Sequence, residues 1–180
     1  YRNKSKGFTK ANGNIPVPSY MFMHIPLQEY TEADRDGHLT GNNFEGVFPP
    51  ELNSGILAAM EECADVHGIF CGHDHTNDFV SKLGAVAHVY GRCSGNGHPD
   101  RGGRVVELSE GDYGFRSWIR EWDGDMVQDY TYEYPVDYRL RKATPFKGKK
   151  NGIAVTKYTG VTSLDDIESK GTAVSTEIVE

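Results

Sequence analysis

The chain has 180 residues, a formal net charge of -7, 37% hydrophobic residues and 25% charged residues. This length and balance predict a folded domain with a hydrophobic core and exclude a disordered chain. No lysine- or arginine-rich block precedes Arg139, so we expect no nucleic-acid partner, and no apolar run is long enough to predict a membrane span. A negatively charged chain can still bind phosphate where metal ions supply the positive charge.

Two short apolar runs in the first half of the chain predict buried strands. Residues 19–23 form the first run, which ends at His24-Ile25-Pro26, because proline cannot donate a hydrogen bond to a sheet. Residues 69–71 form the second run, which leads directly into Gly72-His73-Asp74-His75. Each predicted strand therefore ends with histidine.

One stretch, residues 54–64, has helical periodicity. Four apolar side chains fall on one face of it: Ile56, Leu57, Met60 and Ala64. Asn53 or Ser54 can cap its N-terminus through a side-chain oxygen. We expect residues 1–19 to be a connector and residues 30–50 to be a polar loop.

The rest of the chain reads mainly as strands. Apolar and polar residues alternate along residues 104–108 and 117–122, which is typical of half-buried strands. The full set of strands predicted here is 79–82, 85–90, 103–108, 115–122 and 127–134. With one clear helix, the chain is predicted to be α/β (α+β) in class and β-rich.

A basic segment containing Arg139-Leu140-Arg141-Lys142 and Lys147-Gly148-Lys149-Lys150 predicts a linker. We place a boundary there, between a domain of residues 1–144 and the start of a second β-rich module in residues 145–180, with strands at 153–158 and 172–179. Residues 152–167 resemble the beginning of a module appended to secreted carbohydrate-active enzymes, which favours an extracellular or periplasmic location. The chain opens at Tyr1 without methionine, so we expect both of its ends to be cut.

The histidines predict a metal site. In open α/β sheets the ligand crevice lies beyond the carboxyl ends of the strands, so His24 and residues 72–75 should share one rim. Gly72 would allow a tight turn there. His73 and His75 would face the same side in an extended segment, whereas a turn would direct them towards two neighbouring ions. A single histidine at a strand end is, however, often an ordinary surface residue.

Other residues near these motifs are candidates for supporting roles. Asp74 could orient an imidazole by accepting its second N–H. Asn77 could support the site or simply form a turn. Arg92 and His98, in the glycine-rich loop of residues 91–103, could touch phosphate or belong to a solvated loop.

The motifs together resemble the calcineurin-like metallophosphoesterases, and within them the purple-acid-phosphatase-like branch. The resemblance covers roughly residues 19–108. It is carried by these segments in order: residues 22–30, Asn53-Ser54-Gly55, residues 68–79, Tyr90-Gly91-Arg92 and residues 102–106. Several motifs in the right order are more specific than any one of them.

The resemblance implies a two-sheet sandwich flanked by helices, of which this chain would be the C-terminal half. It makes His24 and His73 ligands of one metal ion and His75 a ligand of another, with iron, zinc or manganese as the ions. The family's remaining ligands come from earlier Asp-x-His, Gly-Asp and Gly-Asn-His motifs. Asp36-Gly37-His38 resembles the first of these only superficially, so a missing N-terminal half would have to supply them.

The activity implied is hydrolysis of a phosphorylated small molecule or another phosphoester. Two ions would hold the phosphoryl oxygens and activate a bridging water for in-line attack. The histidines must be neutral to bind metal, so activity should collapse as they protonate. Because only part of the ligand set is present, we expect the chain by itself to be inactive.

Two alternatives remain open. His73-Asp74 could be the doublet of the HD-type phosphohydrolases, although those doublets lie on helices and this one follows a predicted strand. Alternatively, the chain could be a non-catalytic, β-rich binding or accessory module that retains remnants of a site. Two transition-metal ions in the full-length protein would favour the enzyme, and none would favour the accessory module.

Overall fold

The computed structural model describes residues 1–35, 39–95, 97–110, 112–134, 147–149, 152–157 and 175–177. The chain divides into two compact units, Tyr1–Tyr134 and Pro135–Glu180. Residues 135–146, which include the boundary expected near residue 145, lie outside the described part, so that boundary stays a prediction. Residues 36–38, with the Asp36-Gly37-His38 sequence, lie outside it as well.

The first unit contains a four-stranded sheet that carries the histidines. Its strands are β1 (Ser19–Phe22), β2 (Val66–Cys71), β4 (Val86–Tyr90) and β3 (Val80–Leu83), in the spatial order β1-β2-β4-β3. β1, β2 and β4 are parallel, and β3 is antiparallel to β4. All residues of β2 and β4 are buried, as expected for parallel strands that are covered on both faces.

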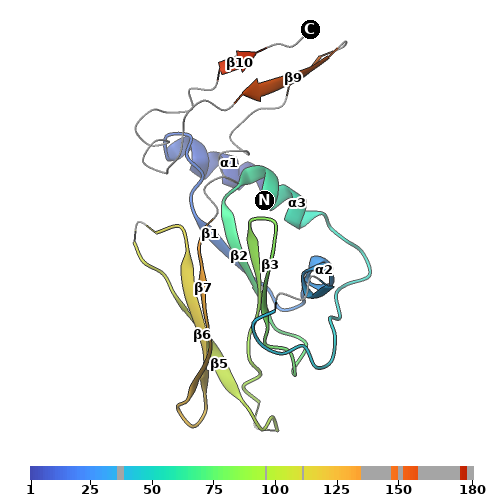
Figure 1. Ribbon diagram of the computed structural model, residues 1–180, viewed down its shortest axis with the longest axis vertical. Coiled ribbons are helices and arrows are strands. Elements are labelled where there is room, and N and C mark those ends of the chain that lie inside the picture. Colours follow the sequence, from blue (N-terminus) through green and yellow to red (C-terminus); the bar gives the residue numbers. More distant parts are fainter. Residues whose placement is uncertain are drawn as a thin grey trace. The chain divides into compact units, whose positions relative to one another are not determined.

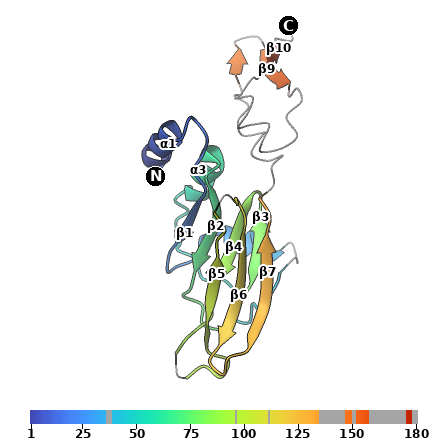
Figure 2. The same ribbon diagram turned by 90° about the vertical axis from the view of Figure 1, so that its left-hand side faces the viewer.

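A second, antiparallel sheet in this unit consists of β5 (Gly102–Glu107), β6 (Phe115–Glu121) and β7 (Met126–Tyr132). Burial alternates along β5 and β6, as the sequence pattern predicted. The ring of Phe115 lies 5.5 Å from that of Phe70 and 5.7 Å from that of Tyr20, so aromatic packing joins the two sheets. Figures 1 and 2 show the second sheet lying beside the first.

The predicted helix is α3 (Ile56–Cys63), and its predicted cap is wrong. Gly55, in the left-handed region with φ 67°, takes the N-cap position without a side-chain cap. Asn53 instead accepts a hydrogen bond from the Gly55 N–H at 2.7 Å. The apolar stripe is confirmed, because Leu57 and Met60 are buried in the core.

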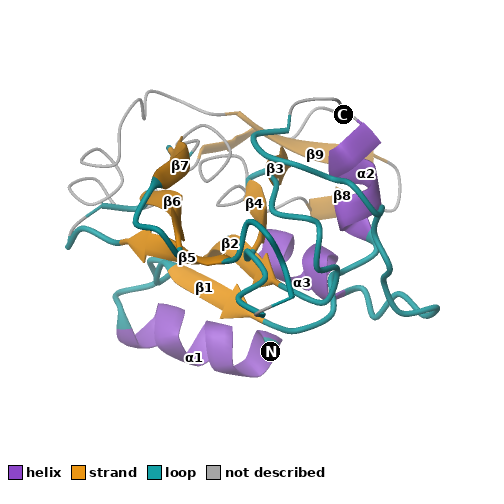
Figure 3. Cartoon of the chain, turned by 90° about the horizontal axis from the view of Figure 1, so that it is seen from below, coloured by secondary structure: helices purple, strands orange, loops and turns teal. Residues whose placement is uncertain are grey.

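Two helices occur where the sequence predicted a connector and a loop. These are α1 (Arg2–Ala11) and α2 (Glu29–Arg35). Only Ser5 of α1 is buried, so no apolar stripe marked this helix in the sequence. Figure 3 shows α2 and α3 covering the face of the four-stranded sheet that is opposite the second sheet.

The second unit contains a three-stranded antiparallel sheet of order β10-β9-β8. Its strands are β8 (Lys147–Lys149), β9 (Gly152–Lys157) and β10 (Ser175–Glu177). β9 overlaps the strand predicted at residues 153–158 and β10 falls within the one predicted at 172–179, whereas β8 lies in the predicted linker. The described part of the chain is thus mixed α/β and strand-rich, with two sheets in the first unit, and it contains no helix long and apolar enough to cross a membrane.

Candidate metal centre

The rim of the four-stranded sheet brings the histidines of two separate segments together. Because β1, β2 and β4 are parallel, their carboxyl ends lie at one edge of the sheet. Backbone bonding continues past the strands: the Gly72 N–H donates to the His24 carbonyl at 3.0 Å, and the Gly91 N–H to the Cys71 carbonyl at 2.7 Å. The segments after β1, β2 and β4 therefore stay hydrogen-bonded to one another just beyond the ends of the strands.

His24 and His73 face each other at this rim. Their ring centroids are 5.3 Å apart and their planes are nearly perpendicular, at 85°. Both side chains are exposed. A Cβ atom at Gly72 would lie 3.8 Å from Nδ1 of His24, in ordinary van der Waals contact with that imidazole.

His73 makes the tight turn that the sequence assigned to Gly72. Its φ is +76°, in the region that side-chain-bearing residues rarely adopt, and the Asp74 N–H donates to the Gly72 carbonyl at 3.0 Å. A hydrogen bond between residues i and i+2 around a positive φ of this size defines the rarer, strained form of γ-turn. Backbone strain of this kind concentrates at functional sites.

His75 follows in the next turn, which is closed by the Asn77 N–H donating to the Asp74 carbonyl at 3.2 Å. Its side chain is exposed. Within the described residues, no three histidine, cysteine, aspartate or glutamate side chains lie close enough to hold one ion. The imidazole set suits a transition metal, and its coordination shell would need further ligands from elsewhere. The assignment of the three histidines to two ions stays a prediction.

Asp74 is buried beneath the turn, between the two exposed histidines. Its Oδ2 atom accepts a hydrogen bond from the Tyr90 hydroxyl at 2.5 Å and another from the Phe48 N–H at 3.3 Å. Burial, together with the neighbouring carboxylate, raises the pKa of Tyr90 above its ordinary value, so this hydroxyl remains a donor. The sequence did not predict either contact.

Asn77 is fully buried and ties the loop before α3 to the histidine turn. Its side-chain oxygen accepts from the N–H groups of Phe44 and Glu45 at 3.1 and 3.3 Å, and its amide donates to the Gly46 carbonyl. The Glu45 carboxylate in turn accepts from the Thr76 N–H at 2.6 Å. Asn77 therefore fixes the backbone on both sides of the turn.

Arg92 lies in an ion-pair network instead of an open loop. Its guanidinium contacts Asp78 at 2.7 Å and Glu121 at 2.9 Å, and it also donates to the Asp100 carbonyl at 2.6 Å. Arg104, which the sequence did not single out, donates to the carbonyls of Tyr90 and Asp78. A phosphate contact by Arg92 stays a prediction.

His98 is half-buried in the loop that follows β4. Its Nδ1 accepts from the Asp100 N–H at 3.2 Å, and its own backbone N–H donates to the Gly95 carbonyl at 3.0 Å. Both contacts are local and order the loop. A phosphate contact by His98 therefore stays a prediction as well.

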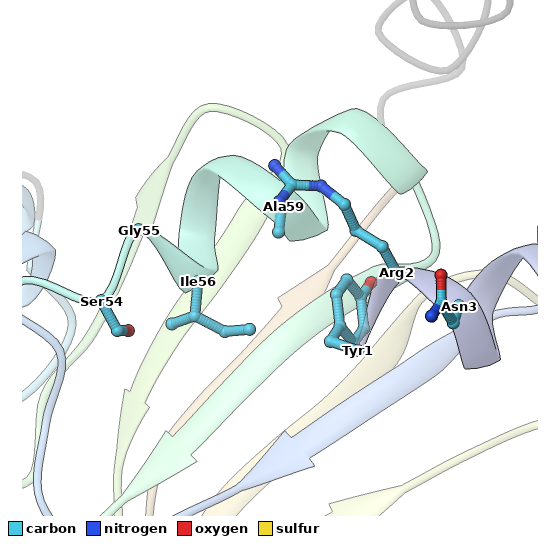
Figure 4. Close-up of a pocket in the computed structure, with 7 residues that line it drawn as sticks. All are labelled: Tyr1, Arg2, Asn3, Ser54, Gly55, Ile56 and Ala59. Carbon is cyan, nitrogen blue, oxygen red and sulfur yellow. The ribbon is translucent and has the colours of Figure 1, made fainter.

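Two hollows of the first unit have linings that lie wholly within the described residues. One, of about 310 Å³, reaches the rim at Gly72 and Gly91 and is lined mainly by Phe22, Phe70 and the two arginines 92 and 104. The other, of about 320 Å³, lies between α1 and the start of α3 and is lined by Tyr1, Arg2, Asn3, Ser54, Gly55, Ile56 and Ala59 (Figure 4). The second hollow contains none of the predicted metal ligands.

No protein-family model matches the chain. Among characterised proteins, it is 33% identical over 82 residues to probable inactive purple acid phosphatase 14 of Arabidopsis thaliana, which covers 46% of this chain and 20% of that protein. It is 30% identical over 116 residues to probable inactive purple acid phosphatase 29 of the same plant, covering 59% and 30% of the two chains. These relatives are purple-acid-phosphatase-like proteins, and the predicted resemblance is confirmed.

A relative named as a phosphatase also occurs in yeast. Phosphatase DCR2 of Saccharomyces cerevisiae is 29% identical over 135 residues, which is 66% of this chain and 23% of that protein. The chain thus spans between 20% and 30% of the length of the curated relatives it matches. Three of these four relatives have the word "inactive" in their names.

Proposed function

We propose that this chain supplies part of a two-metal site in a phosphoester hydrolase, with His24 and His73 binding one ion and His75 the other. The carrying observation is the pair of imidazoles of His24 and His73, 5.3 Å apart at the carboxyl ends of parallel strands. The phosphatase relatives support the reaction class. The remaining ligands would come from segments that precede this chain in the full-length protein.

In this proposal the residues of this chain bind and orient. The imidazoles donate nitrogen lone pairs, which suit iron, zinc or manganese. A bound pair of such ions supplies the positive charge that holds phosphoryl oxygens and makes water acidic enough to attack phosphorus. All three histidines are exposed, so a phosphorylated small molecule can approach them from solvent.

The experiment measures metal content and phosphatase activity on the full-length protein, using a generic aryl phosphate as the substrate. The wild type should bind two transition-metal ions, and His73→Ala should lose one ion together with the activity. Asn12→Ala is the control, because this exposed residue follows α1 and its side chain donates to the nearby Ile15 carbonyl. A His73→Ala protein that retains both metals and full activity would contradict the proposal.

A second candidate is a non-catalytic member that keeps the scaffold, favoured by the relatives named inactive. It predicts a folded full-length protein without phosphatase activity at any metal loading. The HD-type alternative is disfavoured, because His73-Asp74 forms a turn after a strand and does not lie on a helix.

A further inference from the structure

The histidine turn is held from below by residues that belong to other parts of the fold. Asp74, at its centre, is 5% exposed, whereas His73 and His75 on either side of it are exposed. Its Oδ2 atom accepts hydrogen bonds from the hydroxyl of Tyr90, the last residue of β4, and from the N–H of Phe48. Asp74 thus ties the turn to the rest of the fold, whereas His73 and His75 are exposed to solvent.

Strain at His73 makes such an attachment necessary. A residue with a side chain pays a conformational penalty at a φ of +76°, and persists there only where surrounding contacts over-determine the backbone. If the turn were released, His73 would relax to negative φ and its ring would swing away from His24. The 5.3 Å separation of those two rings therefore depends on what holds Asp74.

Tyr90 is well suited to hold it. The residue is fully buried, and its ring centroid lies 4.8 Å from that of Phe79 and 5.2 Å from that of Tyr30. Its backbone carbonyl accepts a hydrogen bond from the Arg104 guanidinium. Its hydroxyl can therefore move little. A hydrogen bond of 2.5 Å to a carboxylate is short and charge-assisted, and bonds of this kind are stronger than neutral ones.

We propose that Tyr90 and Asp74 form a positioning device that holds the strained turn so that His73 and His75 present their imidazoles for metal binding. This inference rests on the proposed function. Neither residue touches the ion or the substrate. In this role Asp74 acts by orienting the backbone of the histidines, and its acceptance of an imidazole N–H stays a prediction.

The test compares two tyrosine variants of the full-length protein, Tyr90→Phe and Tyr30→Phe. Both remove one buried hydroxyl from the same aromatic cluster, but the Tyr30 hydroxyl bonds to the backbone of β2 and β4, donating to the Ile69 carbonyl at 2.7 Å and accepting from the Val89 N–H at 3.2 Å. Zinc affinity is measured by competition with a chelator, and the ligand field is read from the visible spectrum of the cobalt-substituted protein. Tyr90→Phe should weaken zinc binding about 10- to 100-fold and alter the cobalt spectrum. Tyr30→Phe should change neither.

Asp74 provides a rescue comparison. Asp74→Ala should weaken zinc binding as Tyr90→Phe does, whereas Asp74→Asn keeps an oxygen acceptor for Tyr90 and Phe48 and should recover most of the affinity. If Tyr90→Phe and Tyr30→Phe lose the same amount of zinc affinity, Tyr90 contributes only to the stability of the core, and the inference is overturned. Unchanged zinc binding in Tyr90→Phe would overturn it as well.

Hydrogen exchange of the metal-free protein separates this inference from the proposed function. Tyr90→Phe should speed exchange at residues 72–78, and Tyr30→Phe should not. If the wild-type protein binds no metal, but exchange at residues 72–78 is faster in Tyr90→Phe than in Tyr30→Phe, the proposed function fails and the positioning role of Tyr90 stands. If exchange at residues 72–78 is the same in both variants, the positioning role fails whatever metal is bound.

Discussion

Arg92 and Asp78 form an ion pair at 2.7 Å in which each side chain is only 5% exposed. The pair joins the loop after β4 to the segment between the histidine turn and β3, and Glu121 of β6 adds a second contact to the same guanidinium at 2.9 Å. The two sheets are thereby linked by charge close to the rim, as well as by their aromatic core.

We predict that Asp78→Ala destabilises the protein by about 3–5 kcal/mol, because it removes the more buried of the two carboxylates that pair with the buried Arg92 guanidinium. Chemical denaturation of the metal-free, full-length protein measures the loss. Asp129→Ala is the matched control, since it breaks the exposed pair with Arg116 and should cost much less. Equal losses in the two variants would mean that burial of the Arg92–Asp78 pair does not matter.

His73 should be a position at which stability and metal binding conflict. With φ at +76°, glycine fits this backbone better than any residue with a Cβ atom. We expect metal-free His73→Gly to be more stable than His73→Ala by about 1 kcal/mol, while both lose metal affinity. Thermal unfolding in the presence of a chelator measures the difference, and equal stability of the two variants would argue against a strained turn.

Asn77→Ala should loosen the loop that covers the turn. The substitution removes the acceptor for the N–H groups of Phe44 and Glu45, and each lost hydrogen bond costs about 0.5–1.5 kcal/mol. Hydrogen exchange at residues 43–48 should therefore accelerate. Asn12→Ala, at an exposed residue with one local bond to the Ile15 carbonyl, should leave both stability and exchange unchanged.

His88 should make the fold sensitive to acid. It is fully buried against Tyr30, with ring centroids 4.8 Å apart, and its Nε2 has no partner among the described residues. Burial lowers the pKa of His88 from 6.5 to about 4, although the Val86 carbonyl and the charge of Glu29 act in the opposite direction. The unfolded chain therefore takes up a proton at higher pH than the folded one.

Stability from a neutral His88 is thus complete above about pH 6.5 and falls as the pH drops towards 4, by on the order of 3 kcal/mol. Denaturation midpoints of the metal-free protein between pH 4 and 7 measure the slope. In His88→Leu, which removes the titrating group, the slope should flatten in this window. An unchanged slope would assign the acid sensitivity to other groups.

Much of the strand framework could be predicted from the sequence, because it depends on local patterns. Residues 115–122 alternate in polarity, and the structure has β6 there; residues 85–90 are apolar except for His88, and β4 lies there. The helix α1 has no such pattern, since only Ser5 is buried. The histidine pair could be anticipated because parallel strands end at a common edge.

The support beneath the histidines could not be predicted in the same way. The bond between Tyr90 and Asp74 joins the end of one strand to a turn after another, and no spacing in the sequence encodes it. The sequence also assigned the tight turn to glycine, the residue with the greatest conformational freedom, whereas the positive φ falls on His73. Tertiary contacts decide both features.

The hydrogen bond from the Gly72 N–H to the His24 carbonyl places both histidine-bearing segments on the same ladder of backbone contacts. Neighbouring strands lie about 4.8 Å apart whatever side chains they carry, so the spacing between these two positions belongs to the main chain. A histidine at either position can therefore be replaced during evolution, with loss of metal binding, while the fold is kept. Active and inactive proteins can therefore share this fold and differ at only a few residues of the rim.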